Sequence, residues 1–329
     1  MAIQPVNADA LLHLRAIPNL LSIVSPVYGC APCLEDLVER LLRAVDGRCD
    51  AVEIILVDDA CPDNAWPRIL ELAATHSSVK GLRLSRNFGQ HYAIAAGIEH
   101  ARGDIVALLD CDLQDLPEEM PRLLARSREG YDIVFASREQ RQDGLRKRLA
   151  SRAFSGVLGY LTGVPQDHTT ANFGVFSRRA IDLVNRMPER DRCFPLMVKW
   201  TGLPMTTVPV QHAPRTSGRS GYSLRKLINL ATDIVLSYSD KPLRLVVQTG
   251  LWFSVFALVI VLVSVYRFSI GDVAVAGFTS IIASIWLLGG VVTFCVGIIG
   301  LYLGRLFNAS KQRPYYVVAD RTANAEDPA

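Results

Sequence analysis

The chain has 329 residues, more than one compact domain usually needs, and half of them are hydrophobic. Its formal net charge of +3 is too small to favour nucleic acid as a partner. The mean hydropathy of +0.22 is high for a soluble protein and points to membrane segments. The N-terminus lacks a basic flank followed by a continuous apolar run, so no signal peptide is expected.

Apolar runs alternate with helical patterns five times in the first 140 residues. Strands are expected at residues 20–27, 52–57, 79–84, 105–109 and 131–136, and helices at 34–45, 64–75 (capped by Asn64), 89–101 and from 117. Further strands are expected at 173–177 and 206–211. This alternation predicts an α/β fold with a doubly wound, mainly parallel sheet. No GxGxxG follows the first strand and no GxxxxGK[ST] occurs in the sequence, which disfavours dinucleotide oxidoreductases and P-loop enzymes.

The strongest candidate for a site is the end of the fourth expected strand. Five apolar residues, 105–109, predict a strand buried on both faces, and the carboxylates of Asp110 and Asp112 follow directly. In open α/β sheets ligands bind at this end of the strands. Side chains two residues apart on an extended chain point the same way, so Asp110 and Asp112 could bind one hard cation that is shared with a diphosphate. For so short a pattern, a polar loop is the alternative.

Polar side chains follow the other strands too, and in this fold such strand ends line one crevice. They are Tyr28, Asp58, Asp59, Arg86, Asn87 and Arg138. Two basic stretches add candidate phosphate contacts: one runs from Arg138 through Arg148 to Arg152, and the other is the small-residue loop from Arg215 to Ser223. A solvated helix face is the alternative for the first stretch. For His91 we favour a cap or packing role, and for His168 a role in the site stays open.

The seven cysteines show no pairing pattern. Cys30 and Cys33 form a CxxC, but no second pair with zinc spacing follows. We interpret it as a loop before a helix, with a redox role as the alternative. Cysteines in core and crevice stretches indicate a reducing cytosol.

The last third of the sequence predicts a membrane anchor. Residues 224–238 form an amphipathic pattern that favours an interfacial helix. Residues 245–266 and 278–303 contain no charge and exceed the roughly 18 to 20 residues needed to span a bilayer, so they predict a two-helix hairpin. Basic residues flank its outer ends, which places both tails and the N-terminal domain in the cytosol. The Gly300–Gly304 pattern could allow close helix packing. Residues after Asp320 are expected to be disordered.

Six short segments occur in order along the chain ahead of the apolar stretches. They are Ser25-Pro26-Val27-Tyr28, Val57-Asp58-Asp59, Leu84-Ser85-Arg86-Asn87-Phe88-Gly89, Asp110-Cys111-Asp112-Leu113-Gln114-Asp115, Ser137-Arg138, and Arg219-Ser220-Gly221-Tyr222-Ser223 with Lys226-Leu227 behind it. Together with the hairpin they resemble the family-2 glycosyltransferases of GT-A fold, in the branch that glycosylates polyprenyl phosphates. That branch includes dolichyl-phosphate mannose synthases and bacterial undecaprenyl-phosphate sugar transferases.

The resemblance implies a role for each matching residue. Pro26, Tyr28, Asp58 and Asp59 would hold the nucleoside, while Asp110 and Asp112 would bind Mg²⁺ or Mn²⁺ and the donor diphosphate. Gln114 would lie near the metal or the acceptor phosphate. The acceptor phosphate would be held by Arg138, Arg148 and Ser151, with Arg215 and Arg219 of the mobile loop as further candidates. Two departures stand out: Ala60-Cys61 replaces the Gly-Ser that often follows the Asp pair, and Asn172 replaces an acidic residue.

The expected function is metal-dependent, inverting transfer of a sugar from a nucleoside diphosphate sugar, with UDP favoured, to undecaprenyl phosphate for cell-envelope glycan modification. Asp112, Arg138 and Gln114 would be the catalytic residues. We expect a GT-A domain at 1–221, a juxtamembrane helix at 222–244, the hairpin at 245–304 and a cytosolic tail at 305–329. The resemblance also implies a bacterial inner-membrane location and a homotetramer. The alternatives are direct transfer to a glycan or glycerolipid, and an inactive, membrane-tethered nucleotide-sugar-binding protein.

Overall fold

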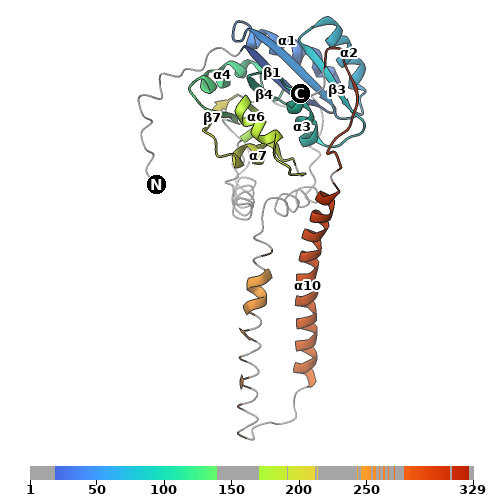
Figure 1. The fold of residues 1–329 in the computed structure, drawn as a ribbon, viewed down its shortest axis with the longest axis vertical. Helices are drawn as coiled ribbons and strands as arrows, with labels where there is room; N and C mark the ends of the chain where they lie inside the picture. Colours follow the sequence, from blue (N-terminus) through green and yellow to red (C-terminus); the bar gives the residue numbers. More distant parts are fainter. Residues whose placement is uncertain are drawn as a thin grey trace. The chain divides into compact units, whose positions relative to one another are not determined.

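The computed structural model describes residues 19–138, 170–190, 192–211, 213, several short stretches between 243 and 270, 278–311 and 313–325 (Figure 1). The chain divides into two compact units. The first comprises residues 1–155, 166–221 and 314–329, and the second comprises 156–165 and 222–313. Each is described by itself below.

The first unit is built on an eight-stranded sheet with the strand order β7-β5-β6-β4-β1-β2-β3-β8. Its strands are β1 (Leu20–Val27), β2 (Ala51–Asp58), β3 (Val79–Leu84), β4 (Ile105–Leu108), β5 (Ile133–Arg138), β6 (Thr170–Ser177), β7 (Met205–Val210) and β8 (Val318–Arg321). Neighbours β4-β1-β2-β3 are parallel, whereas β6 runs antiparallel to both β4 and β5. The predicted α/β class is confirmed, and the sheet is mixed rather than mainly parallel along its whole width.

The strand directions bring the expected polar strand ends to one edge. Because β6 is antiparallel to β4 and to β5, strand β5 runs in the direction of β4, and β7 is parallel to β5. The carboxyl ends of β1 to β5 and β7 therefore lie along the same edge of the sheet. This is the edge at which ligands bind in open α/β sheets.

Helices cover both faces of this sheet. They are η2 (Ala31–Cys33), α1 (Leu34–Val45), α2 (Ala65–Thr75), α3 (Gln90–His100), η3 (Pro117–Glu119), α4 (Met120–Arg128), α6 (Arg178–Asn185) and α7 (Phe194–Trp200). The predicted bounds of α1 are confirmed. The predicted capping role of Asn64 is wrong: the residue precedes α2, but it is left-handed (φ 57°) and its side chain makes no capping hydrogen bond.

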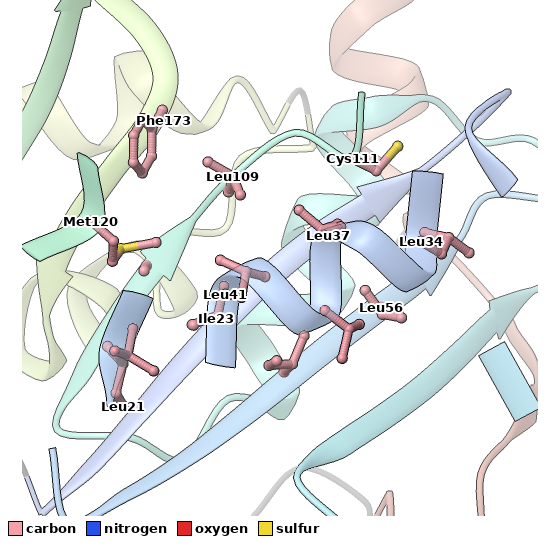
Figure 2. Close-up of a cluster of buried hydrophobic side chains, with 14 of the residues drawn as sticks. Leu21, Ile23, Leu34, Leu37, Leu41, Leu56, Leu109, Cys111, Met120 and Phe173 are labelled. Carbon is pink, nitrogen blue, oxygen red and sulfur yellow. The ribbon is translucent and has the colours of Figure 1, made fainter. Parts of the chain in front are cut away.

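The two faces hold two hydrophobic clusters. On one face, leucines spaced along α1 pack on Ile23 of β1 and Leu56 of β2 (Figure 2). On the other face, α3, α6 and α7 pack on the sheet, where Phe176 makes edge-to-face contacts with two further phenylalanine rings at 5.4 and 4.9 Å. Helix α3 lies so close that a Cβ on Gly97 would stand 2.3 Å from Val24 Cγ1. The small residues of α3 thus allow close packing on the sheet, as its sequence predicts.

The C-terminal tail belongs to the sheet. Strand β8 pairs antiparallel with β3, and Thr322 exchanges backbone and hydroxyl hydrogen bonds with Gly81. Asn324 donates to the Val79 carbonyl at 2.8 Å, and Ala325 is buried. The expected disorder after Asp320 is therefore wrong as far as residue 325. An unpaired β3 edge offers free backbone donors and acceptors, and the tail satisfies them.

The described part of the second unit is dominated by one long helix, α10 (Phe278–Ser310, 33 residues). Within the described residues, one helix is long and apolar enough to cross a membrane. Its segment Leu287–Gly304 has a mean hydropathy of 2.1, and none of that segment is buried. At 1.5 Å per residue, α10 is about 50 Å long, which exceeds the roughly 30 Å hydrocarbon core of a bilayer. Of the first expected span, 245–266, the structure describes a continuous helical stretch at 246–252 and isolated helical positions from there to 266. The expected helix at 224–238 lies wholly outside the described residues.

Candidate functional site

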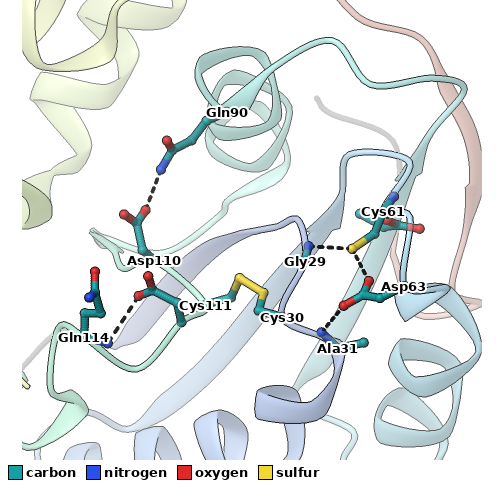
Figure 3. The surroundings of a disulfide bond; sticks show 11 residues. Gly29, Cys30, Ala31, Cys61, Asp63, Gln90, Asp110, Cys111 and Gln114 are labelled. Atoms are coloured by element: carbon teal, nitrogen blue, oxygen red, sulfur yellow. Dashed lines mark hydrogen bonds between the residues drawn. A yellow bond between two sulfur atoms is a disulfide. The ribbon is translucent and has the colours of Figure 1, made fainter. Parts of the chain in front are cut away.

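The Asp-x-Asp loop begins directly after β4. Asp110 Oδ1 accepts a hydrogen bond from Gln90 Nε2 at 2.7 Å, and Asp112 Oδ1 accepts one from the Gln114 backbone N–H at 3.2 Å (Figure 3). Leu113 is held in a left-handed conformation, with φ 57°, while its side chain packs against the core cluster under α1. Such strain in a bulky residue persists only where packing fixes it, which gives this loop a defined shape.

A disulfide ties this loop to the first strand end. Cys30, which follows Tyr28 and Gly29, is bonded to Cys111 between the two aspartates, with a Cα–Cα distance of 6.2 Å (Figure 3). The expectation of unpaired cysteines is wrong for this pair, and the cysteine pattern gives no support for a reducing compartment. Cys33 is a free thiol, so the CxxC does not form a redox pair. Burial and the nearby Asp112 carboxylate raise the pKa of the Cys33 thiol.

The aspartate pair that ends β2 is buried, with both residues 2% exposed. Asp58 accepts from the Cys61 backbone N–H at 2.8 Å and lies 3.7 Å from the Arg83 guanidinium. Asp59 accepts from two backbone N–H groups of the loop after β3, those of Phe88 (2.8 Å) and Gly89 (2.9 Å). Burial raises the pKa of both carboxyls, against the opposing effect of these hydrogen bonds. In this structure Asp59 thus anchors the loop that leads to Gln90.

The loop after β2 is ordered although Ala60-Cys61 stands where the family often has Gly-Ser. Ala60 is left-handed, with φ 49°, a conformation that glycine adopts without strain. The Cys61 thiol accepts from the Gly29 N–H at 2.8 Å and is hydrogen-bonded to Asp63, which in turn accepts from the Ala31 N–H at 2.8 Å. Cys61 therefore links the loop after β2 to the loop after β1.

The nucleoside-side residues from the first strand differ in accessibility. Tyr28 is 55% exposed, so its ring is free to contact a ligand. Pro26 is buried within β1, where it pairs with Val57, so it helps to shape the strand end. Arg86, from the loop after β3, stacks on Phe88 with 4.2 Å between its guanidinium carbon and the ring centroid.

The phosphate-binding candidates lie mostly beyond the described residues. Arg138 is the last residue of β5, opposite Val210 of β7, so its backbone lies at the same sheet edge as Asp110. The expected roles of Arg148, Ser151, His168, Arg215 and Arg219 fall outside the described residues. One described contact bears on the basic loop: the Ala213 N–H donates to the Gln114 carbonyl at 2.9 Å. Ala213, two residues before the basic stretch begins, is therefore bound to the Asp-x-Asp loop.

The donor set at this loop fits a hard divalent cation in part. In the described ranges of the chain, no three His, Cys, Asp or Glu side chains are grouped so that they could hold a metal ion by themselves. Asp110 and Asp112 offer carboxylate oxygens, the ligands that Mg²⁺ prefers. A cation there would complete its coordination with phosphate oxygens and water, as Mg²⁺ usually does in nucleotide sites.

Sequence reasoning missed the residues that hold these side chains in place. Gln90 and Cys30 contact the Asp-x-Asp loop from 20 and 81 residues away. His91, next to Gln90, is half-buried, and in the described part of the structure its Nδ1 atom has no hydrogen-bond partner. Burial lowers the pKa of His91, which agrees with the packing role expected for it.

An open α/β sheet with an Asp-x-Asp loop at its carboxyl edge is the arrangement expected for the glycosyltransferases that the sequence resembles. The family model described as "Glycosyl transferase family 2" matches residues 22–182. A Synechocystis sp. protein named uncharacterized glycosyltransferase sll0501 is 35% identical over 91% of this chain and 95% of its own length. The undecaprenyl-phosphate 4-deoxy-4-formamido-L-arabinose transferase of Salmonella choleraesuis is 34% identical over 90% of this chain and 92% of its own. The chain belongs to glycosyltransferase family 2.

Solved structures show weaker similarity. The mannosyltransferase PcManGT from Pyrobaculum calidifontis, in complex with GDP-Man and Mn²⁺, is 16% identical over 91% of this chain and 88% of its own, with a TM-score of 0.46.

Proposed function

We propose that this glycosyltransferase moves a sugar from a nucleoside diphosphate sugar, with UDP as the favoured nucleotide, to undecaprenyl phosphate. The observation that carries the proposal is the extent of the match to the Salmonella transferase, which covers 90% of this chain. A match of that length includes the apolar α10 region as well as the sheet with its Asp-x-Asp loop. A long apolar helix suits an enzyme whose acceptor is a membrane lipid.

On the donor side, Asp110 and Asp112 would hold Mg²⁺ or Mn²⁺. When bound, the cation would neutralise charge that develops on the departing diphosphate. Gln114 would lie beside it, and its backbone bond to Asp112 supports that position. The exposed Tyr28 ring and the Asp58–Arg83 pair would receive the base and ribose, with Pro26 and Asp59 shaping the pocket around them.

On the acceptor side, Arg138, Arg148, Ser151, Arg215 and Arg219 would hold the lipid phosphate. A phosphomonoester is largely ionised near neutral pH, so its oxygen can attack the anomeric carbon without a general base. The new bond joins that carbon to the acceptor phosphate oxygen, while the bond to the donor diphosphate breaks and the nucleoside diphosphate leaves. A single displacement inverts the anomeric centre. The bond between Ala213 and Gln114 supports this arrangement, since it holds the start of the basic loop at the Asp-x-Asp loop.

The membrane arrangement follows from the same proposal. A GT-A catalytic domain (1–221) and a juxtamembrane helix (222–244) would precede a hairpin (245–304), with both termini in the cytosol of a bacterium. Support comes from β8, which begins eight residues after α10 ends and pairs within the catalytic sheet. A strand cannot pair with a sheet across a bilayer, so in the proposed arrangement the C-terminal end of α10 and the catalytic domain would share the cytosolic side. The homotetramer stays an expectation drawn from the resemblance.

The test is a transfer assay with the purified full chain in detergent. Undecaprenyl phosphate is mixed with UDP-, GDP- and dTDP-sugars and with Mg²⁺ or Mn²⁺, and glycosylated lipid phosphate is detected by mass. We expect a product with one donor, and its loss on chelation. Asp112→Asn should abolish transfer, whereas Asp104→Asn, the same change at the exposed opposite end of β4, should not.

Two results would contradict the proposal in different ways. Wild-type turnover by Asp112→Asn would remove the metal assignment. Nucleotide-sugar binding without any lipid product would favour transfer to a glycan or glycerolipid, or an inactive binding protein.

A further inference from the structure

The Gln90 side chain touches the candidate cation site from an element that the Asp-x-Asp motif does not include. Gln90 is the first residue of α3, and its Nε2 atom donates to Asp110 Oδ1 at 2.7 Å (Figure 3). A carboxylate oxygen that accepts such a bond is fixed in orientation. Less rotamer freedom is then lost when the carboxylate binds a cation.

The position of Gln90 is itself set by the loop before it. Gly89 has φ 106° and ψ 153°, a conformation open to glycine and strained for other residues, and its N–H is bound to the buried Asp59 carboxylate. Behind Gln90, α3 is locked on the sheet by the close approach of Gly97 to Val24. Gln90 therefore projects from a backbone that is fixed on both sides.

These contacts form a continuous connection between the two halves of the donor site. The Asp59 carboxylate holds the backbone of residues 88 and 89, that backbone places Gln90, and the Gln90 amide holds Asp110. We propose that Gln90 is a positioning residue for the cation site: it orients Asp110 for the metal and couples that carboxylate to the nucleoside-side loop anchored on Asp59. This inference rests on the function proposed above.

The expected effect follows from the behaviour of residues that hydrogen-bond to metal ligands. Removing such a residue typically weakens metal binding about 10- to 100-fold. Gln90→Met keeps the length of the side chain and removes the donor, and Gln90→Leu is a second variant in case the first unfolds. His100→Leu removes a polar side chain at the other end of α3, where the His100 ring is hydrogen-bonded within the helix, to the Ala96 carbonyl at 2.8 Å. It serves as the matched control.

The experiment measures Mn²⁺ affinity of the full chain in detergent by electron paramagnetic resonance, with and without UDP. UDP affinity in the presence of a chelator and the thermal unfolding midpoint are recorded alongside. We expect both Gln90 variants to lose about 10- to 100-fold in Mn²⁺ affinity, already without UDP, while metal-free UDP affinity stays within about twofold. His100→Leu should bind Mn²⁺ like the wild type.

The variant Asp110→Asn distinguishes failure of the Gln90 positioning role from failure of the metal assignment. If Asp110→Asn weakens Mn²⁺ binding but folded Gln90 variants do not, the positioning role is wrong and the proposed function is untouched. If Asp110→Asn binds Mn²⁺ like the wild type, the metal assignment itself fails. If His100→Leu weakens Mn²⁺ binding as much as Gln90→Met, any change in α3 suffices and the specific role of Gln90 is refuted.

Discussion

A buried ion pair at the end of the sheet opposite the site offers a quantitative test of the fold. Glu53 of β2 is 4% exposed, and its carboxylate accepts from Lys80 Nζ (2.6 Å), Ser22 Oγ (2.5 Å) and the Arg102 N–H (2.7 Å). Breaking a buried pair by removing one partner typically costs 3–5 kcal/mol, because the other charge is left uncompensated. In Lys80→Met the two remaining hydrogen bonds still reach Glu53, so we expect a loss near the lower end, about 3 kcal/mol.

The pH dependence of this loss has a definite sign. Burial would raise the pKa of Glu53, but the hydrogen bonds from Lys80, Ser22 and Arg102 outweigh it, and the pKa is lowered. Stability gained from a depressed carboxyl pKa is present above the unfolded value, about 4.3, and is lost as the pH falls through the folded value. The gap in stability between wild type and Lys80→Met should therefore close in acid.

The assay is thermal unfolding of the full chain in detergent over a pH series. Arg68→Met provides the control, because Arg68 forms ion pairs with Glu71 at 2.8 Å and with Glu35 of α1, and all three side chains are exposed. Exposed pairs contribute little, so this variant should unfold close to the wild type at every pH. If Lys80→Met unfolds no earlier than Arg68→Met at neutral pH, the reasoning about buried charge in this sheet is wrong.

Four other predictions follow from the site and the tail. Reduction of the Cys30–Cys111 disulfide, which spans 81 residues, should cost about 4–5 kcal/mol by loop entropy, and a reductant should not change the unfolding midpoint of the double alanine variant. Ala60→Gly should stabilise the chain by up to about 1 kcal/mol in thermal unfolding, since the left-handed strain exceeds the added entropy of the unfolded chain. Deletion of 314–329 should lower the unfolding midpoint and promote aggregation measured by light scattering, because it bares the β3 edge. Since burial raises the pKa of Asp58, UDP affinity measured by calorimetry should fall on acidification at a higher pH than for an ordinary aspartate, whereas Asp58→Asn should remove this dependence.

Strands and helices could be predicted where the local pattern of apolar and polar residues determines their bounds. Residues 79–84 and 34–45 were predicted with the bounds that the structure has, because buried runs and a leucine stripe end at clear polar or turn residues. The antiparallel direction of β6 was not predictable. A strand buried on both faces shows no alternation that would reveal its direction, and the chain from 139 to 169 that leads to it is long enough for either.

The residues of the candidate site also differ in whether local sequence reveals them. Asp110 and Asp112 are visible in the sequence because carboxylates break a buried apolar run. Gln90 and Cys30 hold that loop through contacts with partners 20 and 81 residues away. Each lies in or beside a segment that the sequence singles out, but nothing in those segments identifies the partner. The tail strand is the extreme case, since Thr322 bonds to Gly81 across 241 residues. Long-range pairing depends on what the rest of the sheet leaves unpaired, which local sequence does not record.

The two departures from the family pattern, Ala60-Cys61 and Asn172, are the features that would support the alternative of an inactive binding protein, and the structure bears on the first of them. Loss of the usual Gly-Ser would be expected to loosen the loop that presents Asp58. Instead, the Cys61 backbone donates to Asp58 and its thiol accepts from Gly29, so the loop is held both to the end of its own strand, β2, and to the loop after β1. The strain at Ala60 is a cost in stability that those contacts offset. Because this departure leaves Asp58 held in place, it does not favour the inactive alternative over the enzyme.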